Sequence, residues 1–163
     1  IKENEEIETK SGFKSNLNGF CDVYSFFSML PSFANYQNAQ LEIRDQRLCI
    51  RGLGDAFTKQ SRFIGFPPSC EDATKLTITH DPAGAFEAGV SGIIFAAHTH
   101  CGQVYLPFLG PIWMPTDAPR PATCGRYEDE VRMLWVTAGV GTSILPLRLG
   151  VQAEWDLLTL RQK

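Results

Sequence analysis

The chain has 163 residues, of which 44% are hydrophobic and 20% charged, and its net charge is −3. These values are typical of a globular domain, and they exclude the strongly basic surface of most nucleic-acid-binding proteins. The sequence contains no apolar run of roughly 18 residues, the length that suggests a membrane span. We therefore expect residues 1–163 to form a single domain with no nucleic-acid patch and no membrane segment.

The first third of the chain predicts a leader, a helix and a hairpin. Residues 1–20 begin with a cluster of glutamates and are predicted to form a mobile leader. Apolar side chains within 23–30 follow the spacing of an amphipathic helix, which ends at Pro31. Residues 41–44 and 47–51 both alternate apolar and polar side chains around a short polar turn, which predicts a β-hairpin.

Five more strands are predicted in the rest of the chain, one of them a short strand at 103–106. Residues 75–79, 93–97, 133–137 and 151–160 are short runs rich in apolar or β-branched residues. The unbroken apolar run of 93–97 favours a central strand that is covered on both faces. The proline-rich stretch 107–121 predicts a long ordered loop, and such loops are often functional. Several strands with few long helices indicate the α/β or the α+β fold class, and the family resemblance described below favours α/β.

The three histidines of the chain follow two of these strands. His80 follows 75–79, and His98 and His100 follow 93–97, each group leading into a Pro or Gly turn. Ligands of open α/β sheets bind just outside the carboxyl ends of the strands, and imidazole is the commonest metal ligand. The pattern predicts a metal site formed by His80, His98 and His100. A lone histidine after a strand is more often a hydrogen-bonded turn residue, so this prediction depends on the whole set.

The five cysteines give a weaker signal. Their number is odd and no Cys-x-x-Cys pair occurs, which argues against a structural zinc knuckle or a dense disulfide framework. Reduced thiols are therefore expected. The thiol of Cys101 is expected to be a packed bystander rather than a metal ligand.

Two blocks of the sequence resemble a known family of enzymes. Residues 78–82 (Ile-Thr-His-Asp-Pro) and 97–107 (Ala-His-Thr-His-Cys-Gly-Gln-Val-Tyr-Leu-Pro) resemble the last two motifs of the calcineurin-like metallophosphoesterases. The Gly-Gln step within the second block and the tail at 134–149 resemble the bacterial YaeI/YkuE-like subgroup of that family. The resemblance covers roughly residues 41–160.

The resemblance implies a fold, a metal centre and a reaction. It implies a double β-sheet sandwich flanked by helices, with two divalent ions of the Mn, Fe or Zn class. His80 and His98 match ligands of one ion, and His100 matches a ligand of the other. A hydroxide that bridges the two ions attacks the phosphorus of a phosphomonoester or phosphodiester. The expected substrates are phosphate esters of small molecules or lipid headgroups, and the expected location is cytoplasmic or peripheral to a membrane.

The motifs of the family's first half do not occur in this chain. No Asp-x-His or Gly-Asn-His is present, and Gly54-Asp55 lacks the second aspartate of Gly-Asp-x-x-Asp. We therefore expect the chain to be the C-terminal half of a metallophosphoesterase, with the N-terminal half missing. Alone it should bind metal at most partially and should not hydrolyse phosphate esters at a useful rate, and no catalytic residue is assigned.

Two other interpretations stay open. One is a non-catalytic remnant or binding module that has kept the sheet and a partial metal site. The other is a different metal hydrolase, such as an amidohydrolase, which also uses His-x-His. The latter is disfavoured because no histidine follows His100.

Overall fold

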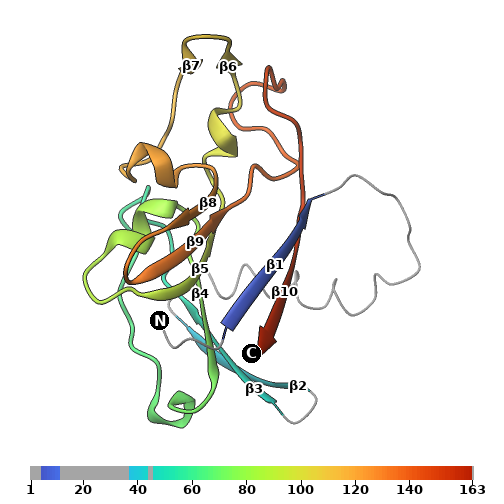
Figure 1. Ribbon diagram of the computed structural model, residues 1–163. Helices are drawn as coiled ribbons and strands as arrows, with labels where there is room; N and C mark the ends of the chain where they lie inside the picture. The colour runs from blue at the N-terminus through green and yellow to red at the C-terminus, as the bar shows by residue number, and fades with distance from the viewer. Residues whose placement is uncertain (1–4, 12–36, 44–45, 163) are drawn as a thin grey trace.

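The computed structural model describes residues 5–11, 37–43 and 46–162 (Figure 1). The amphipathic helix expected at 23–30 lies outside these residues. Of the leader expected at 1–20, Glu5–Ser11 forms a strand instead, and the remainder lies outside the described residues. Across the described part of the chain, no helix is long and apolar enough to cross a membrane.

Strands and short 3₁₀-helices make up the regular structure of the described residues. The strands are β1 Glu5–Ser11, β2 Asn38–Ile43, β3 Gln46–Gly52, β4 Thr74–Ile78, β5 Gly92–Ala96, β6 Tyr105–Leu106, β7 Gly110–Pro111, β8 Gly125–Glu128, β9 Arg132–Val136 and β10 Asp156–Gln162. The 3₁₀-helices are η2 Pro68–Cys70, η3 Pro82–Phe86, η4 His100–Gly102 and η5 Arg120–Ala122.

Six strands form one mixed sheet in the order β2-β3-β4-β5-β9-β8. The four central strands β3, β4, β5 and β9 are parallel, whereas β2 and β8 pair antiparallel at the two edges. The predicted hairpin is confirmed as β2 and β3, and the strands predicted at 75–79 and 93–97 are found as β4 and β5, which pair in parallel. Because the central strands run the same way, their carboxyl ends meet at one edge of the sheet.

Both faces of the sheet carry apolar side chains. In β5, Ile94 and Ala96 point to one face, and Ile93 and Phe95 point to the other, as expected from the period of two in a strand. The first face is the better covered and holds a fully buried cluster. Its members are Leu53, Ala85, Val90, Ile94, Ala96, Ala122, Leu134 and Val136. The second face is centred on Ile50, Leu76 and Ile93.

The fold departs from the expected sandwich in its helices and in its last strand. The described residues contain only 3₁₀-helices, so the flanking helices of the expected α/β architecture are not among them. Prolines sit at or before the first position of η2, η3 and η5, where they favour a short turn. The strand predicted at 151–160 begins later, at Asp156, and β10 pairs antiparallel with β1 in a separate two-stranded sheet.

The expectation of reduced cysteines is wrong for four of the five. Cys49 of β3 is bonded to Cys70 of η2, and Cys101 of η4 is bonded to Cys124 just before β8. The partners are separated by 21 and 23 residues, and chain topology alone brings them together. Cysteine counting gave no sign of these pairs because it registers only short, regular spacings. Cys21 lies outside the described residues.

Candidate metal centre

The three histidines lie at the carboxyl ends of adjacent parallel strands. His80 follows β4, His98 follows β5, and His100 begins η4. Backbone hydrogen bonds extend beyond the two strands, because the amide of Ala97 donates to the carbonyl of His80 at 3.0 Å. The amide of His80 in turn donates to Gly54 at 3.1 Å. The backbone thus fixes the separation of the first two histidines.

His80 and His98 form a close pair. The Nε2 atom of His80 lies 2.9 Å from Nδ1 of His98, and the ring centroids are 4.6 Å apart. The other ring nitrogen of His98, Nε2, lies 2.9 Å from the carbonyl oxygen of Pro115. A carbonyl only accepts, so we assign the proton of His98 to Nε2. The lone pair on Nδ1 of His98 is therefore directed toward His80.

The surroundings of His80 favour its neutral form. The residue His80 is exposed overall, but its ring is partly shielded from water. This desolvation, followed by the neighbouring His98, lowers the pKa of His80 below its ordinary value, although Asp55 and Asp81 act in the opposite direction. Neutral imidazole is the form that binds metals, so the environment favours the ligand state of His80.

His100 contacts a different part of the molecule. Its Nδ1 lies 3.1 Å from the carbonyl oxygen of Ala138, which follows β9. Arg148 also approaches Nδ1, but its N–H groups already donate to the carbonyls of Ala138 and Gly139 at 2.7 and 2.9 Å. We therefore assign the Nδ1 proton of His100 to the bond with Ala138, which leaves its Nε2 free to accept. The carboxylate of Glu154 holds this segment by accepting from the amide of Ala138 at 2.9 Å.

The backbone has positive φ angles at His98 and again from His100 to Gln103, whereas Thr99 between the two histidines is right-handed. The φ angles of His98, His100, Cys101, Gly102 and Gln103 are 66°, 48°, 52°, 89° and 45°. Such angles cost energy for any residue other than glycine, so they need support from elsewhere. The sequence indicated a turn here but not this conformation.

Three contacts support the turn. The Cys101–Cys124 disulfide ties it to the segment before β8, which corrects the expectation of a bystander thiol. The buried hydroxyl of Thr99 donates to the carbonyl of Thr123 at 2.8 Å. The side chain of Gln103 bridges to the loop at 143–145, donating to the carbonyls of Ser143 and Leu145 at 3.0 and 2.9 Å.

The two carboxylates that act electrostatically on His80 are already engaged in turns. Asp55 accepts from the amide of Phe57 and the hydroxyl of Thr58, at 3.1 and 2.9 Å. Asp81 is fully buried and accepts from the amide of Ala83 at 3.0 Å and from the hydroxyl of Thr116. Within the described residues, no three His, Cys, Asp or Glu side chains converge to hold a metal.

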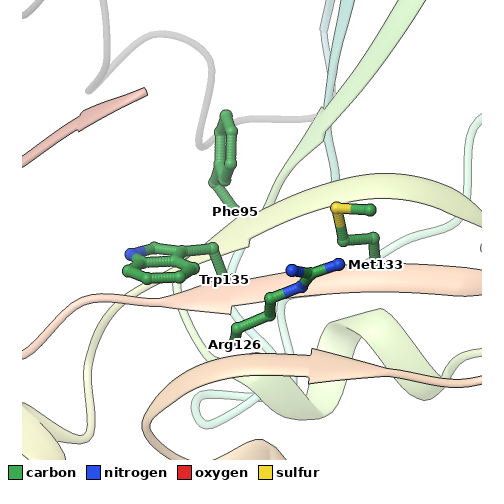
Figure 2. Close-up of a pocket in the computed structure, with 4 residues that line it drawn as sticks. All are labelled: Phe95, Arg126, Met133 and Trp135. Atoms are coloured by element: carbon green, nitrogen blue, oxygen red, sulfur yellow. The ribbon is translucent and has the colours of Figure 1, made fainter. Parts of the chain in front are cut away.

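The structure brings His80 and His98 together, and it places His100 on the same cavity as His98. This cavity has a volume of about 280 Å³, and its other walls are largely apolar. The lining residues are His98, Thr99, His100, Gly102, Gln103, Val104, Ile112, Trp113, Pro115, Ser143, Ile144 and Leu145. A second hollow, between Phe95, Arg126, Met133 and Trp135 on the second face of the sheet, measures only about 10 Å³ (Figure 2). It has room for about one water molecule, so the cavity at the histidines is the candidate site.

Sequence reasoning missed the groups that orient the histidines. They are the backbone carbonyls of Pro115 and Ala138, and the guanidinium of Arg148, which donates to the same carbonyl of Ala138. The proline-rich loop was flagged as functional, and Pro115 belongs to it. Every residue has a backbone carbonyl, so the sequence does not indicate which carbonyl contacts a histidine. The contact between Pro115 and His98 is therefore visible only in the structure.

No protein-family model and no solved structure matches this chain. Over 145 residues it is 28% identical to a Bacillus subtilis protein named as the uncharacterized metallophosphoesterase YkuE, with 85% of this chain and 50% of that protein covered. Over 161 residues it is 25% identical to a Danio rerio transmembrane protein with a metallophosphoesterase domain, with 86% of this chain and 36% of that protein covered. The chain thus spans half or less of the length of these curated relatives.

Proposed function

From this distant similarity to metallophosphoesterases, we propose that the chain is the C-terminal half of a metal-dependent phosphoric-ester hydrolase, acting on phosphodiesters or phosphomonoesters. One observation carries the proposal: His80 and His98 lie 2.9 Å apart at the carboxyl ends of β4 and β5. The matching motifs and the place of the pair in the sheet both support a metal site there.

The hydrogen bonds of the histidines suit metal ligands. A ligating histidine usually donates its other ring N–H to a carbonyl or carboxylate, which fixes the ring and its tautomer. His98 has this arrangement with Pro115, and His100 has it with Ala138. The lone pair on Nδ1 of His98 faces Nε2 of His80, where an ion would replace the hydrogen bond between the rings, and Nε2 of His100 keeps its own lone pair. We propose that His80 and His98 hold one divalent ion and that His100 belongs to the site of a second.

The donor set within the described residues does not complete a dinuclear centre. Ions of the Mn, Fe or Zn class, when bound, supply Lewis-acid activation of water and neutralise charge on phosphoryl oxygens. Hard divalent ions need carboxylates as well as imidazoles, and the nearby Asp55 and Asp81 are committed to turns. We propose that the residues of this chain orient imidazoles and shape the cavity, and that further ligands come from a missing half.

The alternative function is a non-catalytic remnant or binding module. It is favoured by one observation, the lack of three converging ligand side chains among the described residues. On this alternative the histidine pair is a structural hydrogen bond between two turns. The sheet and the cavity would then serve binding only.

We propose that the protein is located at the periphery of a membrane rather than in the cytoplasm. Two disulfides link segments of the described structure. Stable disulfides are rare in a reducing cytosol and common in secreted, periplasmic or surface proteins. We therefore infer an oxidising side of the membrane.

Metal titration separates the two functions. Zn²⁺ binding to the purified chain, followed by calorimetry, is expected to be weak and to be lost in His80→Ala and His98→Ala. His100→Ala is the matched control, and it should keep the first ion because His100 lies outside the pair. Equal loss in all three variants would contradict the two-ion assignment, and no binding by the folded wild type would favour the remnant.

In a separate assay, the chain should not hydrolyse bis(p-nitrophenyl) phosphate. Turnover that His98→Ala abolishes would overturn the half-enzyme proposal.

A further inference from the structure

Two loops that border the cavity expose a large amount of apolar surface. Phe108 at the β6–β7 turn is fully exposed, and Ile144 in the loop between β9 and β10 is 82% exposed. Leu109 in the same turn, Ile112 and Trp113 just after β7, and Leu145 beside Ile144 are also more than half exposed. We call the six residues the apolar rim: Phe108, Leu109, Ile112, Trp113, Ile144 and Leu145.

The two loops form one continuous surface. The side chain of Gln103 forms two hydrogen bonds with the loop between β9 and β10. It accepts from the amide of Ser143 at 2.7 Å and donates to the carbonyl of Leu145. The amide of Tyr105 donates to Leu149 at 2.7 Å, and Leu149 donates back to Gln103 at 3.0 Å. In Figure 1 both loops project from the same end of the molecule, beyond the carboxyl ends of the central strands.

The charge pattern of this end is unusual. The chain has 18 acidic residues, yet segments 101–116 and 138–153 contain neither Asp nor Glu, and Arg148 is their sole charged residue. A surface that faces water normally mixes charges of both signs. An exposed apolar patch without carboxylates suits a lipid bilayer, whose phosphates repel negative side chains.

The aromatic residues of these loops also suit a bilayer. Trp113 and Tyr105 are about half exposed and flank the more exposed Phe108 and Leu109. Tryptophan and tyrosine are enriched at the level of lipid headgroups, because one end of each ring is apolar and the other is polar. Purely apolar side chains such as Phe108 reach further into the hydrocarbon layer.

The rim continues directly into the histidine cavity. Ile112, Trp113, Ile144 and Leu145 belong both to the rim and to the cavity walls, and His98 and His100 lie in another wall. An amphiphile whose apolar part lies along the rim would have its polar headgroup beside the imidazoles. The geometry therefore matches a molecule with a hydrocarbon part and a phosphate part.

We propose that the apolar rim docks into the interfacial layer of a lipid bilayer, and that the substrate is a phosphate ester of a membrane lipid. The second part rests on the proposed function, whereas the docking does not. The rim brings the cavity to the membrane surface, so a lipid headgroup reaches the histidines without leaving the bilayer completely.

Vesicle binding tests the docking without any catalysis. The chain is sedimented with vesicles of phosphatidylcholine and phosphatidylglycerol in buffer with a metal chelator. We expect binding that falls at least tenfold in the Phe108→Ser/Leu109→Ser and Ile144→Ser/Leu145→Ser variants. The matched control is Ile43→Ser/Val131→Ser, which removes two exposed apolar side chains at the opposite end of the sheet and should leave binding unchanged.

Tryptophan fluorescence gives a second readout on the folded protein. Lipids brominated near the headgroup should quench the tryptophan fluorescence of the wild type, and the quenching should decrease in Trp113→Phe.

Failure of the folded chain to bind vesicles, or equal loss of binding in the control variant, would overturn the docking. Vesicle binding together with a lack of metal binding would support docking and reject the proposed function, so the two failures are distinguishable. Rim-dependent self-association without vesicle binding would assign the surface to a protein contact instead and overturn the proposal.

Discussion

At the residue scale, the backbone between His98 and Gln103 determines where the imidazoles point. In a regular strand, His98 and His100 would share one face, because side chains alternate with a period of two. The left-handed φ angles turn the two rings toward different partners, Pro115 and Ala138. Each non-glycine residue in this conformation costs roughly 1–2 kcal/mol. The conformation of this segment therefore lowers the stability of the fold, but it positions the rings of His98 and His100.

Gly102 is the position where this turn requires glycine. Its φ is +89°, and an added Cβ would collide with the ring of Pro111. We expect Gly102→Ala to reduce the free energy of unfolding by about 1–3 kcal/mol, through the combined strain and collision. Chemical denaturation measures the loss. Gly65→Ala is the control, because a Cβ there has no neighbour within 4 Å. A loss at Gly102 no larger than at Gly65 would contradict the described turn.

At the element scale, strands with strong apolar patterns were predictable, and weak or distant pairings were not. The hairpin of β2 and β3 and the parallel pair of β4 and β5 follow from alternation and from buried runs, which are local properties. Strand β8 was missed because its polar sequence, Gly-Arg-Tyr-Glu, is determined by pairing with β9 rather than by its own composition. The place of the histidine site was predictable from strand ends, whereas its carbonyl partners come from residues 17 and 38 positions away.

The turn between β8 and β9 depends on one carboxylate. Asp129 accepts from the amides of Val131 and Arg132 at 3.0 and 2.9 Å and forms an ion pair with the Arg132 side chain. Desolvation raises the pKa of Asp129, but these hydrogen bonds and the guanidinium outweigh it, so the pKa lies below its ordinary value. The native state therefore binds a proton at Asp129 less readily than the unfolded state does.

The sign of the pH dependence follows from this difference. A carboxylate with a lowered native pKa stabilises the fold above its unfolded pKa of about 3.9, and the contribution is lost as the pH falls through the native value. We expect Asp129→Asn to lower the melting temperature by a few degrees near neutral pH and by progressively less below about pH 4. Asp72→Asn controls for the loss of one exposed negative charge. A difference between wild type and Asp129→Asn that persists unchanged in acid would exclude the carboxylate as the cause.

At the scale of the whole molecule, covalent links support a sheet whose described surroundings contain only short 3₁₀-helices. Among the described residues, one face of the main sheet carries a cluster of eight buried side chains and the second a cluster of three. The Cys49–Cys70 disulfide links β3 to the segment that leads into β4, and the Cys101–Cys124 disulfide links the histidine turn to β8. The two links therefore stabilise opposite ends of the sheet. Because the two disulfides lie at opposite ends of the sheet, we predict that they differ in their effect on the histidine site.

Removal of each disulfide tests this prediction. Closing loops of 21 and 23 residues reduces the entropy of the unfolded chain, which is worth about 3 kcal/mol for each link. We expect Cys49→Ser/Cys70→Ser and Cys101→Ser/Cys124→Ser to lower the melting temperature similarly. Only the second pair should change the histidine resonances in NMR spectra, because only Cys101 adjoins His100. Reductant should destabilise the wild type but not the variant that lacks all four cysteines, which is the control. Detection of five free thiols in protein purified under oxidising conditions, or equal changes in the histidine resonances in both double variants, would contradict this arrangement.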